Sequence, residues 1–187
     1  MSDIDDTYQS NGLLLERAPF GLEEIQDYDE GGHHPVHLGD VISQRYRVIH
    51  KLGNGGFANI WLCRDLTESG FKYNAIKIIM AEYSTTEYGE LHLEELKAAV
   101  ATGGDDGAAY VSLPISQFEI EGPNGTHLCF VYQVLGPKVS SGKLRSGDRD
   151  LVLKNVCHRI VGAVDFIHRH GICHGGKYTD DTIFTRS

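Results

Sequence analysis

A run of glycines followed by a lysine is the part of this sequence whose residue types best suit a chemical task. The glycines fall in residues 52–60, and Lys77 follows in an apolar stretch. Because glycine has no Cβ, backbone N–H groups around it can approach the oxygens of a polyphosphate, and a lysine on the next strand adds a positive charge there. Glycines in a hairpin can serve turn geometry alone, but the lysine in mid-strand favours a phosphate clamp.

Strand patterns on both sides of the glycines would position this clamp. Residues 47–52 lead into the glycines as one strand, and residues 59–65 lead out of them as a second. Residues 67–70 make a turn, and the isoleucine-rich residues 71–80 form a third strand that carries Lys77. The three strands would therefore bring the glycines and the lysine to the same phosphates.

A helix and a second hairpin complete this unit. Residues 84–87 fit a capping box, and spaced leucines give a helical face that ends at residues 103–104. Residues 110–120 lead through a turn at residues 121–125 into a strand over residues 126–135. Together these patterns predict an α+β fold with a five-stranded antiparallel sheet and one helix.

Composition and charge exclude several classes of function. The chain has 187 residues, and no apolar run approaches the roughly 20 residues that a membrane span requires. The formal net charge of −9 and the lack of a basic stripe argue against direct binding of nucleic acid. Scattered cysteines without a CxxC pair, and the lack of an N-terminal signal, indicate reduced thiols in the cytoplasm or nucleus.

The histidines and cysteines do not predict a metal site. His33, His34 and His37 lie close together in the sequence, and Cys157 and Cys173 are each followed by a histidine. Neither set has the ligand spacing of a closed zinc site. We therefore expect these side chains to be structural.

Charge and turn residues divide the chain into three parts. Residues 1–27 are acidic and turn-rich, and we expect a mostly disordered tail. Residues 28–137 hold the sheet, the helix and a connector. Residues 138–187 hold a polar linker and then an amphipathic helix over residues 151–170.

Several segments match one known family in the order in which that family has them. They are residues 28–40, 45–53, 60–62, 122–127 and 131–137. In these segments the chain resembles the SR-protein-specific serine/threonine protein kinases, particularly the fungal-type members. The resemblance implies a kinase amino-terminal lobe over residues 28–137, followed by the start of a truncated helical carboxy-terminal lobe.

The same resemblance implies ATP and Mg²⁺ as ligands and Arg-Ser-rich splicing proteins as substrates. Gly53, Gly55 and the following backbone would cover the phosphates, and Lys77 would contact them. Glu90 of the expected helix would pair with Lys77, and Glu94, one turn later, is the alternative partner. The residues implied in nucleotide binding are Leu52, Gly53, Asn54, Gly55, Gly56, Phe57, Ala58, Ile60, Ala75, Lys77, Glu90, Gln133 and Leu135.

The catalytic loop of that family would follow the second helix. Aligned on His174, the family's catalytic aspartate falls at Gly176 and its metal-binding asparagine at Asp181. A glycine cannot accept a hydroxyl proton, and loss of a positioned general base costs about 10²- to 10⁴-fold in rate. Asp181 can still hold magnesium through its carboxylate. No catalytic residue is therefore expected to be intact.

Three hypotheses follow for the function of the chain. The sequence ends at Ser187, before the family's Asp-Phe-Gly segment, so we expect no measurable kinase activity from this chain alone. A non-catalytic nucleotide-binding or scaffolding module and a truncated kinase product fit that expectation, whereas Gly176 contradicts an active kinase. The P-loop spacing of residues 171–177 is a coincidence, because Tyr178 takes the magnesium-binding position and the segment follows a helix.

Overall fold

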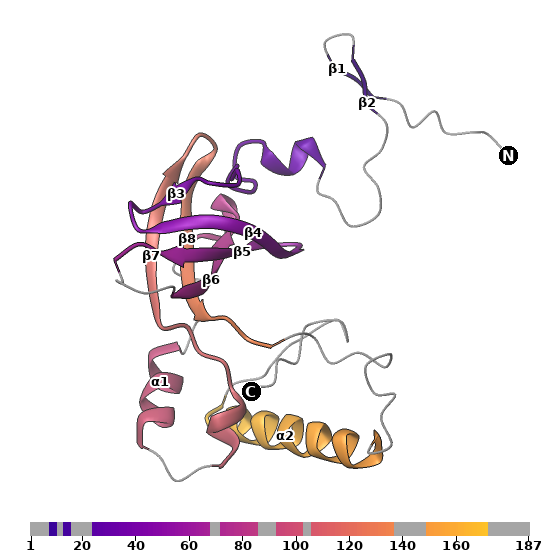
Figure 1. Cartoon of the computed structure of the whole chain (residues 1–187), viewed down its shortest axis with the longest axis vertical. Helices are drawn as coiled ribbons and strands as arrows, with labels where there is room; N and C mark the ends of the chain where they lie inside the picture. Colours follow the sequence, from indigo (N-terminus) through magenta and orange to yellow (C-terminus); the bar gives the residue numbers. More distant parts are fainter. Residues whose placement is uncertain are drawn as a thin grey trace, which may run out of the picture. The chain divides into compact units, whose positions relative to one another are not determined.

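The computed structural model describes residues 8–10, 13–15, 24–67, 72–85, 93–102, 106–136 and 149–171 (Figure 1). The chain divides into two compact units. The first comprises Met1–Gly89 and Gln117–Phe130, and the second comprises Glu90–Ser116 and Val131–Ser187. The first unit is built mainly on strands and the second mainly on helices.

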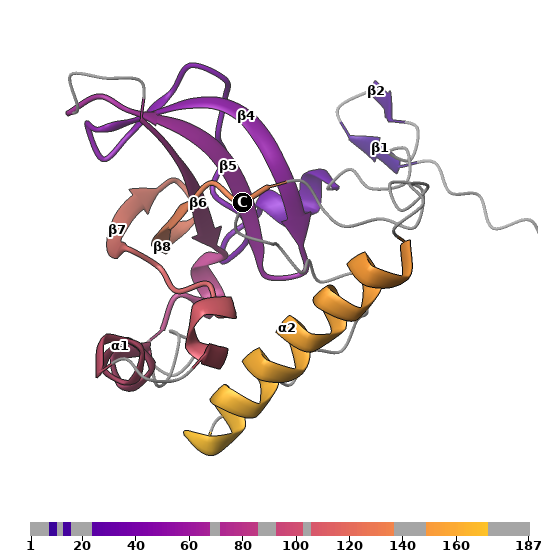
Figure 2. The same ribbon diagram turned by 60° about the horizontal axis from the view of Figure 1, so that its bottom comes forward.

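A six-stranded sheet forms the core of the first unit. Its strands are β3 (Val41–Ile42), β4 (Tyr46–Gly55), β5 (Ala58–Asp65), β6 (Tyr73–Ile79), β7 (Ser116–Gly122) and β8 (Gly125–Gln133). The strand order is β3-β4-β5-β6-β8-β7, and Figure 2 shows β4, β5 and β6 side by side. The predicted α+β class and the strands around the glycines are confirmed. The sixth strand, β3, was not predicted, because two residues are too few to show an alternating pattern.

Alternation along β5 and β6 separates two faces of the sheet. Trp61 lies opposite Ile76, and both side chains are buried. Ile60 lies opposite Lys77, and both are half-buried. Because successive side chains of a strand point to opposite faces, Lys77 shares a face with Ile60, while Trp61 and Ile76 pack on the other. Burial of each large apolar side chain there stabilises the fold by roughly 1.5–3 kcal/mol.

Short elements precede the sheet. Strands β1 (Tyr8–Ser10) and β2 (Leu13–Leu15) pair antiparallel, and a 3-10 helix, η1, covers Ile25–Tyr28. The expectation that residues 1–27 are mostly disordered stays a prediction, because most of that range lies outside the described residues. After η1 the chain leads into β3, the first strand of the sheet.

The segment after η1 is fastened to the sheet through the turn between β7 and β8. The Asn124 side-chain amide donates to the carbonyl oxygen of His33 at 2.7 Å, and the N–H of Gly31 donates to the carbonyl oxygen of Asn124 at 2.9 Å. Gly32 is required here, because a Cβ on it would lie 2.9 Å from the carbonyl oxygen of Asp29. The Asn124-Gly125 turn, with Gly125 at φ 132°, is as predicted. In addition to forming the turn, the Asn124 side chain binds the backbone of the N-terminal segment.

Three helical elements build the second unit: α1 (Leu93–Thr102), the 3-10 helix η3 (Asp106–Tyr110) and α2 (Arg149–Arg169). Ala108 of η3 is buried with Phe166 and Ile167 of α2. Gly107 allows this approach, since a Cβ there would lie 2.9 Å from the Cβ of Phe166. α2 ends at Arg169, and Gly171 follows two residues later with a φ of 75°, which suits a residue without a Cβ.

Candidate nucleotide-binding site

The glycine-rich segment is a tight hairpin rather than an open loop. Gly53 lies opposite Ile60 and Gly55 lies opposite Ala58, so β4 and β5 are joined by only Gly56 and Phe57. Gly53, Gly55 and Gly56 all lack the positive φ that favours glycine, unlike Gly125 and Gly171. Turn geometry therefore does not account for them.

Space around the glycines fits the alternative, close approach by a ligand. An added Cβ on Gly53 or Gly56 would meet nothing within 4 Å, and one on Gly55 would meet only the carbonyl oxygen of Ala58 at 3.9 Å. Gly55 and Gly56 are exposed. The backbone of the hairpin is thus open to a ligand, and N–H groups in such a position suit an anion.

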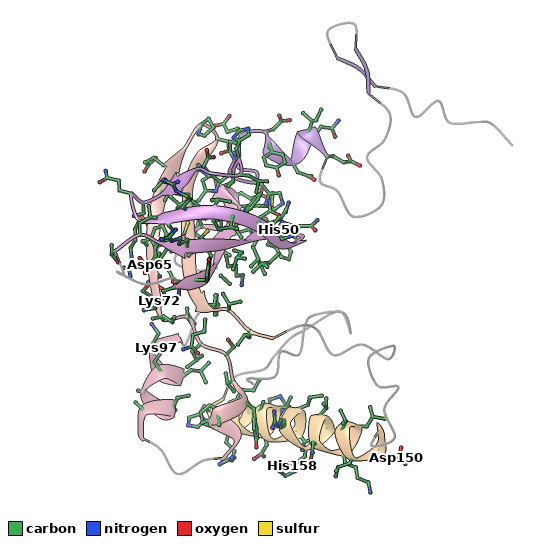
Figure 3. The ribbon with its side chains drawn as sticks, viewed as in Figure 1. His50, Asp65, Lys72, Lys97, Asp150 and His158 are labelled. Atoms are coloured by element: carbon green, nitrogen blue, oxygen red, sulfur yellow. The ribbon has the colours of Figure 1, made fainter. Side chains whose placement is uncertain are left out.

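Lys77 lies on the strand next to this hairpin. It stands opposite Ile60 in the β5–β6 ladder, and Ala75 stands opposite Leu62, so these residues share one face. The Lys77 ammonium lies 6.0 Å from the centre of the Phe130 ring on β8. Figure 3 shows the side chains of this sheet, with Lys72 just before β6. The arrangement brings a cation and an open glycine backbone to the same part of the first unit.

Other predicted residues are placed individually or lie outside the described residues. Gln133 is the last residue of β8, and Leu135 lies two residues beyond it. Glu94 lies on α1, but the structure does not describe its side chain. Four further predicted residues lie wholly outside the described ranges: Glu90, His174, Gly176 and Asp181. The pairing of Lys77 with Glu90 or Glu94, the hinge contacts to adenine and the roles in the catalytic loop therefore stay predictions.

A buried cluster of histidines lies at the junction of the N-terminal segment and the sheet. His127 is fully buried, with its Nδ1 2.9 Å from the carbonyl oxygen of Ile79 and its Nε2 3.0 Å from Asn124 Oδ1. The rings of His34 and His127 meet edge-on at 4.9 Å, and His33 is buried nearby. Burial lowers the pKa of all three imidazoles. Within the described ranges, no group of three or more His, Cys, Asp or Glu side chains is suited to hold a metal.

Sequence patterns did not identify Tyr83, whose ring touches Phe57 at the tip of the glycine hairpin. No local pattern signals this contact, because an aromatic residue outside a periodic segment has no assigned face. Ser84, which the sequence suggested as the start of a capping box, makes other contacts in the structure. Its hydroxyl donates to the carbonyl oxygen of Met80 and accepts from the N–H of Leu128, each at 2.8 Å. Ser84 thus ties the end of β6 to β8.

No family model matches the sequence. The serine/threonine-protein kinase spk-1 of Caenorhabditis briggsae is 35% identical over 173 residues, which cover 88% of this chain and 15% of that protein. SRSF protein kinase 3 of Homo sapiens is 33% identical over 154 residues, covering 78% of this chain and 26% of that one. A serine/threonine protein kinase of Aspergillus fumigatus is 34% identical over 183 residues, which cover 94% of this chain and 44% of that protein.

The chain spans less than half the length of each of these relatives. A solved kinase domain aligns with a TM-score of 0.49 and 19% sequence identity over 74% of this chain and 39% of that one. Among the helices in the described ranges, none has the length and apolar character needed to cross a membrane. On the sequence identities, the chain belongs to the SR-protein-specific family of serine/threonine protein kinases, with its sheet as the amino-terminal lobe.

Proposed function

We propose that this chain binds ATP through the glycine hairpin of β4 and β5 and through Lys77 of β6. The observation that carries the proposal is the register that sets Gly53 opposite Ile60 and Ile60 opposite Lys77. The hairpin backbone, open at Gly53 and Gly56, would donate N–H groups to the phosphates, and the Lys77 ammonium would add a point charge. The kinase relatives support ATP as the nucleotide.

The proposal includes impaired phosphoryl transfer. Gly176 stands where the family has its catalytic aspartate, and a glycine has no group to accept the proton of a substrate hydroxyl. Asp181 would be the residue to hold Mg²⁺, since its carboxylate supplies the hard oxygen that this ion prefers. Bound magnesium would neutralise phosphate charge, while this chain's own contribution would be to bind and orient the nucleotide.

The proposed protein partners are Arg-Ser-rich splicing proteins in the cytoplasm or nucleus. SRSF protein kinase 3 is among the relatives, and the net charge of −9 favours encounter with arginine-rich segments. Without efficient transfer, the chain would act on such partners as a nucleotide-binding or scaffolding module.

Thermal and chemical unfolding with ATP test the proposal. ATP at a hundredfold over its Kd is expected to raise the free energy of unfolding by about 2.7 kcal/mol. Lys77→Ala should lose most of this gain, because it removes the cation beside the hairpin. Lys72→Ala is the matched control, since Lys72 is exposed and precedes β6. No gain in the wild type, or an equal gain in Lys77→Ala, would overturn the proposed site.

The same preparations test the impairment. With ATP, Mg²⁺ and an Arg-Ser peptide, the wild-type chain is expected to transfer no measurable phosphate. Robust turnover that Lys77→Ala abolishes would show that Gly176 does not prevent catalysis and would refute that part of the proposal.

A further inference from the structure

The tip of the glycine hairpin rests against a short helical turn that follows β6. This turn is η2 (Ala81–Tyr83), and the rings of Phe57 and Tyr83 meet edge-on, with 4.7 Å between centres and 72° between planes. Even with this contact, Phe57 is 61% exposed. The N–H of Met80 donates to the carbonyl oxygen of Phe57 at 2.9 Å, which brings the tip and η2 together.

η2 is itself held from two directions. The N–H of Ala81 donates to the carbonyl oxygen of Gly32 at 3.0 Å, and that of Glu82 donates to Gly31 at 2.8 Å. Ser84, the next residue after η2, bonds both to Met80 and to the backbone of Leu128 on β8. Tyr83 therefore projects from a turn that is fastened to the N-terminal segment and to the sheet.

The rest of the hairpin tip has little side-chain support. Asn54, Gly55 and Gly56 are exposed, and an added Cβ on Gly56 would meet nothing within 4 Å. Edge-to-face contact between aromatic rings stabilises beyond the area that it buries. The Phe57–Tyr83 contact thus limits the movement of a glycine-rich segment that would otherwise be free to bend.

We propose that Tyr83 is a positioning residue for the phosphate-binding hairpin. Its ring holds Phe57, and through Phe57 it keeps the backbone of Gly55 and Gly56 in place for the phosphates of the nucleotide. A hairpin that is ordered before binding loses less conformational freedom on binding, so the ligand is held more tightly. This inference rests on the proposed ATP site, and it gives Tyr83 no direct contact with the nucleotide.

Tyr83 should affect the binding only of ligands that carry phosphates. Loss of the aromatic contact is expected to weaken ATP binding about 2- to 10-fold, the range that an aromatic pair supports. Adenosine, which has no phosphate for the hairpin to hold, should bind Tyr83→Leu and the wild type equally. A general loss of structure would weaken both ligands, so the pair of ligands separates positioning from stability.

The experiment measures Kd for ATP and for adenosine, by titration calorimetry, with the full 187-residue chain. Tyr83→Leu removes the ring, and Tyr83→Phe keeps the edge-to-face contact and should behave as the wild type. Phe57→Leu should weaken ATP binding by a similar factor, and Phe57→Leu with Tyr83→Leu should be no weaker than either alone. Tyr73→Leu is the matched control, since Tyr73 is 43% exposed at the start of β6.

The outcomes separate this inference from the proposed function. If the wild type binds ATP more tightly than Lys77→Ala, but Tyr83→Leu binds ATP as the wild type does, the positioning role is wrong and the site stands. Equal weakening of ATP and adenosine in Tyr83→Leu would also overturn the positioning role. If wild type and Lys77→Ala bind ATP equally, the proposed site itself fails, and this inference fails with it.

Discussion

Arg45 and Asp65 form a partly buried ion pair at the first strands of the sheet. Asp65, at the end of β5, is 1% exposed and takes two bonds from the Arg45 guanidinium, at 2.7 and 3.0 Å. Thr67 adds bonds from its N–H and its hydroxyl. These donors, Arg45 first, hold the pKa of Asp65 well below its usual range. The carboxylate can therefore stay charged although it is shielded from water.

Replacement of Arg45 by methionine should destabilise the first unit. It would remove the two hydrogen bonds that the guanidinium donates to the buried carboxylate of Asp65, at a cost of about 2 to 4 kcal/mol. Urea unfolding followed by fluorescence measures this, because Trp61 is the only tryptophan and is 7% exposed in this unit. Arg47→Met is the control, since Arg47 is exposed on β4. Equal stability of the two variants would show that the pair contributes little.

At the scale of elements, the turn between β3 and β4 carries backbone strain. Ser43 and Gln44 have φ of 49° and 56°, and the N–H of Arg45 closes the turn on the carbonyl oxygen of Ile42 at 3.0 Å. Hairpin turns with two positive φ angles favour Asn-Gly, because side chains with a Cβ are strained there. The strain is local, so it can be relieved without a change in the strands.

Gln44→Gly is expected to stabilise the first unit by about 1 kcal/mol, because glycine adopts positive φ without a steric cost. Gln117→Gly provides a matched control on the exposed part of β7. There the backbone is ordinary, and glycine should destabilise by about 0.5 to 1 kcal/mol. The same Trp61 fluorescence measures both variants. A loss of stability in Gln44→Gly would refute the strain argument.

Local patterns in the sequence predict β4 to β8, the two hairpins and α2, because each has a period or a turn residue that belongs to it. The glycine hairpin and Lys77 were predicted for the same reason. Contacts between distant segments were not: Tyr83 against Phe57 and Asn124 against the backbone of His33 leave no local pattern. These contacts depend on how the sheet brings β6 and the β7–β8 turn to the N-terminal segment.

At the scale of the whole molecule, the histidine cluster couples the N-terminal segment to the sheet. His33 and His34 come from that segment and His127 from β8, with Asn124 bonded to both sides. Burial lowers the pKa of each imidazole, although Asp27, Asp40 and Glu121 act in the opposite direction on one imidazole each. For His33 and His34 the neutral imidazole therefore suits the folded state and the protonated one opposes it, whereas both ring nitrogens of His127 face oxygen acceptors, the carbonyl oxygen of Ile79 and Asn124 Oδ1.

Acidification should loosen this junction before the carboxylates of the protein titrate. Histidines in the unfolded chain have a pKa of about 6.5, so their contribution to stability is present above that pH and is lost as the pH falls toward the lower folded values. We expect the free energy of unfolding to fall by on the order of 1 kcal/mol between about pH 7.5 and 5.5. Urea unfolding followed by Trp61 fluorescence across this range measures the loss.

His34→Gln should flatten this pH dependence, because glutamine keeps polar atoms at the junction but takes up no proton. His50→Gln is the matched control, since His50 is exposed on β4, where Figure 3 marks it, and that variant should keep the wild-type slope. If His34→Gln instead retains the full slope, His34 is not a source of the pH dependence. A flattened slope in His34→Gln alone would establish that the N-terminal segment holds to the sheet through neutral histidines.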